Sequence, residues 1–244
     1  MNGPANLCAL TCRTCGIVTP ETWDEVPDAV VRGLNSRKTI RRLPKGTVLF
    51  HDGDAVAALY RLLSGVVLLR KGDHDGNCVI TRLVIPDGTL GFRAFAAGQP
   101  HSVAAHCATD VVVCCIPADA AELAFANNRA LERAFAQHVA QELAYVEDAV
   151  LAQMRLPVRP RLILLLAQLV ETFGEEQPDG SVLAPLPVLR SEIAAMAGIA
   201  RETFSRSLRK IEAEGLLLFV GNAVSVPDPA ALVRAARDIR RGVT

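Results

Sequence analysis

The sequence predicts an α+β chain with an N-terminal antiparallel β-roll, a long helix and a C-terminal winged helix-turn-helix. Three observations predict this order. Short apolar runs punctuated by glycine fill residues 38–118, a segment without glycine or proline spans 128–154, and a two-helix pattern followed by a hairpin occupies 190–226. We therefore divide the chain into four segments: a cysteine-bearing arm (1–20), the roll (21–127), the long helix (128–157) and the C-terminal domain (158–244).

The composition is that of a globular protein and does not decide whether the chain binds nucleic acid. Half of the 244 residues are hydrophobic and 21% are charged, which is typical of a folded protein rather than a disordered one. Lys plus Arg and Asp plus Glu both number 26, so the formal net charge is zero. A nucleic-acid-binding surface is still allowed, but its basic residues must be gathered locally.

The seven cysteines are clustered rather than spread through the chain. The first fifteen residues lack the basic start and long apolar run of a secretory signal, and no stretch reaches the roughly 18 apolar residues of a spanning helix. We therefore expect a cytoplasmic protein without membrane contact. In that compartment clustered cysteines favour a metal or redox site over a disulfide framework.

The roll is predicted by strand-length apolar runs that alternate with turn signals. Pairs such as Asp52-Gly53, Asp75-Gly76 and Asp87-Gly88 separate them, at the spacing expected of antiparallel hairpins. The expected strands are Thr47–Phe50, Leu59–Leu63, Val66–Leu69, Val79–Ile85 and Val111–Ile116.

The segment Asn128–Met154 is rich in good helix formers and carries an apolar stripe. A helix of roughly 40 Å is too long to lie flat on a small roll. We therefore expect its stripe to pack against a second copy of the chain, as in a two-stranded coiled coil; an ordinary core helix is the alternative. Pro157 and Pro160 are expected to end it, before a buried helix at 161–173. The stripe consists of Leu131, Phe135, Val139, Val146 and Val150.

Two short helices are predicted from Arg190 to Gly215. Ile193 and Ala197 give the first helix an inner face, and Gly198 stands where a tight turn needs a left-handed residue. The second helix is expected to begin near Ala200. Its apolar positions recur at helical spacing and predict a buried face formed by Phe204, Leu208 and Ile211.

The opposite face of the second helix carries the chemistry that reads base edges in a DNA major groove. Arginine can donate two hydrogen bonds to guanine, glutamate can accept one from cytosine, and serine can pair with either. A hairpin at 216–226 would form the wing, and a merely solvated charged face is the alternative. The expected DNA-binding residues are Arg201, Glu202, Ser205, Arg206 and Arg209.

Over nearly its whole length the chain resembles the CRP–FNR family of bacterial transcription regulators. Lys45–Asp54, Leu59-Tyr60 and Pro86–Gly88 are similar to the family's cyclic-nucleotide-binding-like roll, and Glu202 to Arg206 matches the Glu-x-x-Ser-Arg reading motif of the FNR branch. The resemblance implies a non-enzymatic homodimeric regulator that binds a palindromic FNR-like DNA site and works with RNA polymerase.

The resemblance does not extend to cyclic nucleotide binding. Family members that bind cyclic AMP carry a Gly-Glu pair and then an Arg-Ser pair in the phosphate-binding turn. The corresponding stretch, 88–102, lacks the glutamate and has no arginine before Ser102; Arg93 is the cation nearby. A phosphate would lack its bidentate partner, so we expect no cyclic nucleotide here.

The motif Cys8-x-x-x-Cys12-x-x-Cys15 resembles the N-terminal cysteines that hold an oxygen-labile 4Fe–4S cluster in FNR proteins. Thiolates are the natural ligands of such clusters. The resemblance aligns Cys114 with the cluster ligand on the roll, giving the set Cys8, Cys12, Cys15 and Cys114. FNR proteins have a further cysteine after the third, which is absent here.

Other readings of the cysteines and histidines remain open. Cys107 and Cys115 are rivals for the fourth position, although Cys115 should face away from Cys114 on a strand. Cys78, Cys107 and Cys115 are otherwise expected to be small core residues. Instead of an iron–sulfur cluster, the cysteines could hold a zinc ion, or the N-terminal arm could be loose and bind no metal. Alternatively, the roll could sense a small molecule or a haem-bound gas. A radical S-adenosylmethionine enzyme shares the cysteine spacing, but no βα alternation follows. The histidines show no ligand spacing and are expected to be surface or satisfied polar residues.

Overall fold

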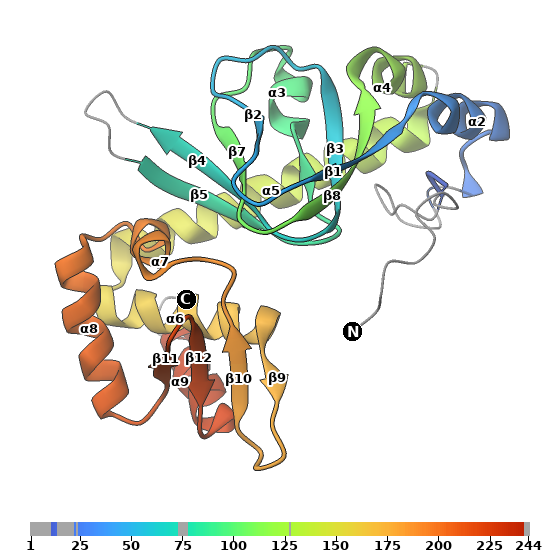
Figure 1. Cartoon of the computed structure of the whole chain (residues 1–244). Helices are drawn as coiled ribbons and strands as arrows, with labels where there is room; N and C mark the ends of the chain where they lie inside the picture. Colours follow the sequence, from blue (N-terminus) through green and yellow to red (C-terminus); the bar gives the residue numbers. More distant parts are fainter. Residues whose placement is uncertain (1–10, 14–21, 23, 73–77, 127, 242–244) are drawn as a thin grey trace. The chain divides into compact units, whose positions relative to one another are not determined.

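The computed structural model describes residues 11–13, 22, 24–72, 78–126 and 128–241 (Figure 1). They fall into two compact units, Met1–Ala144 and Tyr145–Thr244, and the division lies within a single long helix. The four segments expected from the sequence make a finer division and stay a prediction. Among the described helices, none combines the length and apolar character needed to cross a membrane.

The first unit contains the predicted antiparallel β-roll, built from two four-stranded sheets. One sheet has the order β1-β8-β3-β6 and the other β2-β7-β4-β5. All five expected runs correspond to strands, whereas β1, β6 and β7 were not anticipated. The bounds are β1 Thr39–Leu43, β2 Val48–Phe50, β3 Ala58–Ser64, β4 Val67–Gly72, β5 Cys78–Val84, β6 Thr89–Leu90, β7 Ala104–Cys107 and β8 Val111–Pro117.

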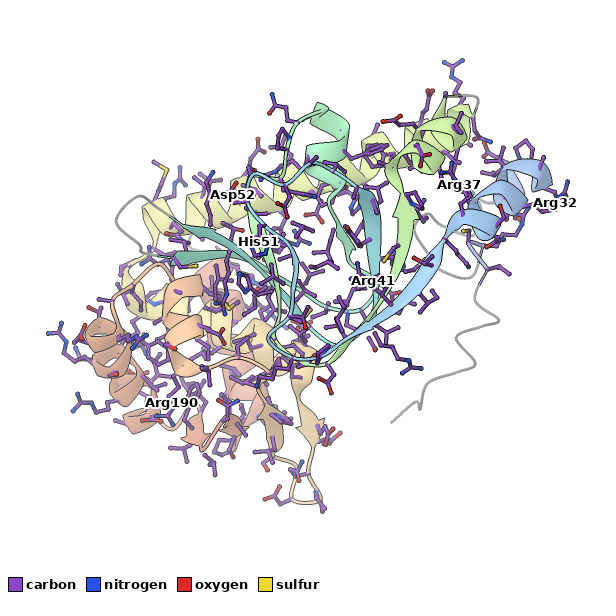
Figure 2. The ribbon with its side chains drawn as sticks, turned by 45° about the horizontal axis from the view of Figure 1, so that its top comes forward. Arg32, Arg37, Arg41, His51, Asp52 and Arg190 are labelled. Atoms are coloured by element: carbon purple, nitrogen blue, oxygen red, sulfur yellow. The ribbon has the colours of Figure 1, made fainter. Side chains whose placement is uncertain are left out.

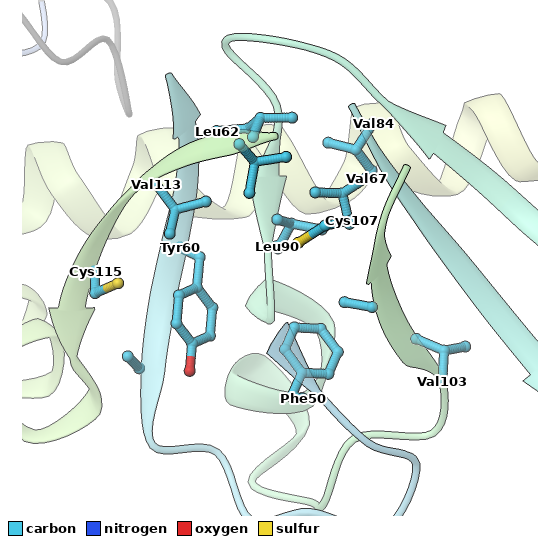
Figure 3. Packing of buried hydrophobic residues seen from close by; sticks show 13 residues of the cluster. Phe50, Tyr60, Leu62, Val67, Val84, Leu90, Val103, Cys107, Val113 and Cys115 are labelled. Carbon is cyan, nitrogen blue, oxygen red and sulfur yellow. The ribbon is translucent and has the colours of Figure 1, made fainter. Parts of the chain in front are cut away.

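The interior of the roll is a core of side chains from both sheets (Figure 3). Leu62 of β3, Leu90 of β6 and Val113 of β8 are all fully buried there. Burying a side chain of this size contributes about 1.5–3 kcal/mol. Phe50 and Tyr60 stack with their ring centroids 5.9 Å apart. This core holds the two sheets together.

A second core lies on the outer face of the sheet β1-β8-β3-β6. Leu59 and Ile116, direct partners across β3 and β8, supply its sheet side, and Leu34 and Leu131 belong to helices that cover it. Because side chains alternate along a strand, β3 and β8 each contribute side chains to both cores. The bounds of the helices in this unit are α2 Asp28–Arg37, α3 Phe92–Ala97, α4 Ala118–Phe125 and α5 Arg129–Arg155.

The long helix α5 changes its surroundings along its length. Leu131 is buried in the outer core, and Phe135 and Val139 are half-buried. Further along, the apolar side chains are about half or more exposed. The helix is therefore a core helix at its start and carries a solvent-facing apolar stripe afterwards. The exposed side chains at spacings of three and four residues are Leu143, Val146, Val150 and Met154.

The second unit packs helices beside a four-stranded antiparallel sheet of order β11-β12-β10-β9. The core of this unit contains fully buried side chains from three helices: Leu162 and Leu166 of α6, Ile193 of α7 and Ile211 of α8. The long helix α5 ends at Arg155, just before Pro157, as expected, whereas Pro160 does not end it but lies in the first turn of α6, where a missing N–H costs nothing. The bounds are α6 Val158–Phe173, β9 Glu175–Glu176, β10 Val182–Pro185, α7 Arg190–Met196, α8 Arg201–Ala213, β11 Leu218–Val220, β12 Ala223–Val226 and α9 Pro229–Arg241.

Candidate functional site

The turn between α7 and α8 has the conformation that the sequence predicted. Gly198 adopts φ +63°, in the left-handed region that glycine occupies without steric cost. An added Cβ would also lie 3.2 Å from the side-chain oxygen of Gln153. Both the backbone angle and the close neighbour therefore favour glycine at this position.

Helix α8 presents one apolar and one polar face. Phe204, Leu208 and Ile211 are buried, as the helical spacing predicted. The opposite face projects into solvent and carries several cations together with the carboxylate of Glu202. All five side chains expected to bind DNA are exposed on α8: Arg201, Glu202, Ser205, Arg206 and Arg209.

A hollow of about 360 Å³ lies between α7 and α8 on this side of the second unit. Arg201, Ser205 and Arg209 line it from α8, and Arg190 lines it from α7 (Arg190 is labelled in Figure 2). The hollow therefore gathers three guanidinium groups and one carboxylate, that of Glu212, although the whole chain has no net charge. A locally basic surface of this kind suits a polyanion such as DNA.

Arg190 was not among the residues expected from the sequence. Its guanidinium lies 4.7 Å from the ring centroid of Phe219 in β11, and it donates to the carbonyl of Gly221 at 3.5 Å. From α8, Glu212 accepts a hydrogen bond of 3.1 Å from the backbone N–H of Phe219. The β11–β12 hairpin, the predicted wing, is thus tied to both helices. Arg190 and Phe219 are 29 positions apart, and no local pattern links them.

The second candidate site is formed by cysteines of the first unit. Cys12 and Cys114 are both fully buried and belong to the same outer core. Of the four expected metal ligands, these two lie in the described part of the chain, whereas Cys8 and Cys15 lie outside it. Within that described part, no group of three or more histidine, cysteine or acidic residues is placed to hold a metal.

Polar contacts fix the short segment around Cys12. Its backbone N–H donates to the side-chain oxygen of Asn35 in α2 at 2.9 Å. The next residue, Arg13, pairs with Asp28 at 2.7 Å and donates to the carbonyl of Val26 at 3.3 Å. Helix α2 is itself joined to α4 by an ion pair between Arg37 and Asp119 (Arg37 is labelled in Figure 2). Cys12 is therefore held against α2 in the outer core.

The remaining roll cysteines have different surroundings. Cys107 and Cys115 point into the interior core, so the expectation that Cys115 faces away from Cys114 is confirmed (Figure 3). Burial raises the pKa of both interior thiols. These rivals for the fourth ligand position are thus on the other side of the sheet from Cys12. Cys78 is exposed, so its expected place in a core is wrong.

The turn that would bind a cyclic nucleotide phosphate offers one guanidinium. Arg93 of α3 donates to the hydroxyl of Ser102. His101 is buried and stacks on Phe50 at a centroid distance of 3.8 Å, and burial lowers its pKa. The imidazole is therefore neutral at pH 7. Because His101 is buried, the expectation that it is a surface residue is wrong.

His138 on α5 departs from that expectation as well. Its Nε2 atom is buried and has no hydrogen-bond partner among the described residues. Burial lowers its pKa, opposed by Glu142 and assisted by Arg82 and Arg61. The ring lines an apolar cavity of about 30 Å³ together with Leu59 and Leu131.

Comparison with known proteins finds a matching domain family for each of the two units. Residues 40–128 match the cyclic nucleotide-binding domain, and residues 160–235 match the Crp-like helix-turn-helix domain. Over 182 residues, 70% of its length, the chain is 32% identical to the transcriptional regulator SdrP of Thermus thermophilus, of which 84% is covered.

Two further similarities extend over most of the chain. It is 25% identical over 236 residues to the fumarate and nitrate reduction regulatory protein of Escherichia coli, covering 96% of this chain and 93% of that one. A crystal structure of a CRP/FNR family transcriptional regulator from Thermus thermophilus has a TM-score of 0.69 and 26% identity. The matched region covers 82% of this chain and 98% of the chain in that crystal structure.

Proposed function

The chain belongs to the CRP/FNR family of transcription regulators, and we propose that it acts as a homodimer whose DNA binding is controlled by an oxygen-sensitive 4Fe–4S cluster. DNA binding through the helix-turn-helix and the absence of an enzymatic role follow from the family. The homodimer, the identity of the base-reading residues and the iron–sulfur cluster are proposed in addition to what the family shows.

The DNA-reading part of the proposal depends on α8. Its apolar face is anchored in the core of the second unit, so its outer face projects as a rigid surface. In a helix-turn-helix the first residues of the second helix reach base edges, which assigns Arg201, Glu202, Ser205 and Arg206 to base contacts. Arg209 lies further along and would meet phosphate. This exposed, cation-rich face over a buried stripe is the observation that carries the proposed function.

The dimer part of the proposal depends on α5. Dimerisation is typical of the family, and the exposed stripe from Leu143 to Met154 has the three-and-four spacing of a coiled-coil seam. Pairing two copies along this stripe would remove its apolar side chains from water. A two-fold dimer presents two copies of α8, which matches a palindromic site.

The cluster part of the proposal depends on the outer core. Cys12 and Cys114 come from segments about a hundred positions apart, yet both are fully buried in the same core. Cys8 and Cys15 are separated from Cys12 by only three and two residues, so the chain can bring them to the same place. Four thiolates are the donor set of a 4Fe–4S cluster, and Cys12 and Cys114 would supply two of them. When bound, the cluster would supply reactivity toward oxygen or nitric oxide.

The residues around Cys12 indicate how such a site would control the dimer. Asn35 and Asp28 hold the Cys12 segment on α2, and Leu34 of that helix packs in the same core as Leu131 at the start of α5. Ligation would fasten the arm to this core. Loss of ligation would free the arm and loosen the packing that orients α5.

A second candidate is a family regulator without a cluster that senses a small neutral molecule. The observation favouring it is the apolar cavity beside α5, where the Nε2 atom of His138 has no partner among the described residues. Its volume of about 30 Å³ has room for a molecule little larger than water, so haem would require the core to open.

The deciding experiment is anaerobic purification with iron, acid-labile sulfide and visible absorbance measured before and after air, alongside binding to a palindromic DNA probe. We expect a brown protein that loses colour and DNA affinity in air. Cys114→Ser should lose iron, while Cys115→Ser, its neighbour on the same strand, should keep it. A colourless protein without iron or sulfide that still binds the probe would contradict the cluster and favour the second candidate.

A further inference from the structure

A buried arginine shares the sheet face of Cys114. Arg61 of β3 is only 6% exposed, and it stands directly opposite Cys114 in the β3–β8 register. The flanking pairs fix which face this is. Leu59 and Ile116 lie in the outer core, while Tyr60 and Cys115 lie in the interior core. Alternation therefore places Arg61 on the outer face with Cys114, and Cβ atoms of such directly opposed pairs are about 4.5–5.5 Å apart.

The hydrogen bonds of Arg61 leave part of its charge without a buried partner. One terminal nitrogen donates to the carboxylate of Asp87 at 2.7 Å, but that carboxylate is 84% exposed and remains hydrated. The Nε atom of Arg61 is buried and has no acceptor among the described residues. Burying a guanidinium is costly unless it is fully paired, so this arrangement calls for a further electron-rich partner.

The other charged groups near Arg61 do not supply that partner. Arg82 of β5 and Glu142 of α5 form an ion pair with each other. His138, on the same helix, has a pKa lowered chiefly by burial, so its ring is neutral at pH 7. Within the described residues of the outer core, the sulfur of Cys114 is the group that the strand register brings to Arg61.

We propose that Arg61 is the buried counter-cation of the Cys12–Cys114 site and stabilises the negative charge of an iron–thiolate centre held there. The inference rests on the proposed cluster function and assigns a residue that the cysteine motif does not reveal. A centre bound by four thiolates carries net negative charge, and its reduction potential depends on that charge and on hydrogen bonds to the sulfurs. A buried cation beside one ligand changes the local charge, and its unused N–H can donate a hydrogen bond to the sulfur.

The test compares Arg61→Met, which keeps an unbranched side-chain stem but removes the guanidinium and its charge, with Arg61→Lys, which restores a cation. Iron per chain, the midpoint potential and the rate of colour loss in air are measured on anaerobically purified full-length protein. We expect Arg61→Met to bind less iron, shift the potential to more negative values and lose colour several-fold faster. Arg61→Lys should recover most of each property.

Two controls separate the charge from the ion pair. Asp87→Asn weakens the Arg61 ion pair but keeps the guanidinium. Arg82→Met breaks the ion pair between β5 and Glu142 of α5, and Leu69 rather than a cysteine stands opposite Arg82. Both should resemble the wild type in potential and air sensitivity. If Asp87→Asn reproduces Arg61→Met, the role of Arg61 is structural and the proposal is overturned.

The outcomes also distinguish this inference from the function on which it rests. An Arg61→Met protein with wild-type iron, potential and air sensitivity overturns the role of Arg61 and leaves the cluster intact. Wild-type protein without iron overturns both, because no anionic centre is then present. Unfolding by urea, followed in parallel, shows whether each variant is folded.

Discussion

Cys114 and Cys115 are adjacent in the chain, yet their side chains lie in different cores on opposite faces of one sheet. Cys114 shares the outer core with Cys12, and Cys115 shares the interior of the roll with Tyr60 and Cys107. Two neighbouring thiols thus have different environments because β8 is covered on both faces.

Substituting the interior cysteines should affect stability without affecting metal content. Cys107→Ala and Cys115→Ala each leave a small cavity in a packed core, so we expect the free energy of unfolding to fall by about 1 kcal/mol. Iron content should stay at the wild-type value. Urea unfolding and iron analysis on the same preparations check both statements; iron loss in either variant would return Cys107 or Cys115 to the ligand set.

Substituting Gly198 should destabilise the helix-turn-helix. At φ +63° an alanine is strained by about 1–2 kcal/mol, so Gly198→Ala should lower the free energy of unfolding by that amount. Gly33→Ala is a matched control, since Gly33 lies within α2 with open space around its Cα. That variant should be neutral or stabilised by up to about 1 kcal/mol. Equal effects at the two positions would refute the role assigned to the turn.

Acid should destabilise the roll through His101. Burial lowers the pKa of His101 in the folded state, opposed by Asp54 and assisted by Arg93. The unfolded chain therefore binds the proton more readily, and the stabilising contribution is complete above the unfolded histidine pKa of about 6.5 and lost as the pH falls through the folded value. His101→Phe, which keeps an aromatic ring on Phe50, should weaken the dependence of unfolding free energy on pH between pH 7.5 and 5.5.

How far the sequence predicts this structure depends on the range of the signal. The buried face of α8 was predictable because Phe204, Leu208 and Ile211 repeat at the period of a helix. The pairing of Arg61 with Cys114 was not, because 53 positions separate them and only the strand register brings them together. The same holds for Arg190 and Phe219. Short strands such as β6, with two residues, are too brief for alternation to be recognised.

The apolar stripe of α5 should determine the oligomeric state. Val146→Lys places a charge in the middle of the exposed stripe, where burial against a second copy would leave it unpaired, so we expect dissociation to monomers at micromolar protein. Gln141→Lys is the control, because Gln141 is exposed on the opposite side of the same helix. Light scattering coupled to size exclusion measures the mass. A dimer that survives Val146→Lys would place the interface elsewhere.

Two cations of α8 should differ in how they contribute to DNA binding. Arg206 lies in the half of α8 assigned to base edges, so Arg206→Ala should cost about 1–3 kcal/mol and relax the preference at one base position. Lys210, near the end of the helix, would meet phosphate. Lys210→Ala should weaken binding to every sequence to a similar degree and reduce the slope of log K against log salt by about 1. Fluorescence anisotropy over a panel of single-base variants of the palindrome, at several salt concentrations, separates the two effects. Uniform weakening by Arg206→Ala across that panel would move Arg206 to the phosphate-contacting group and shift the base-reading role toward Arg201, Glu202 and Ser205.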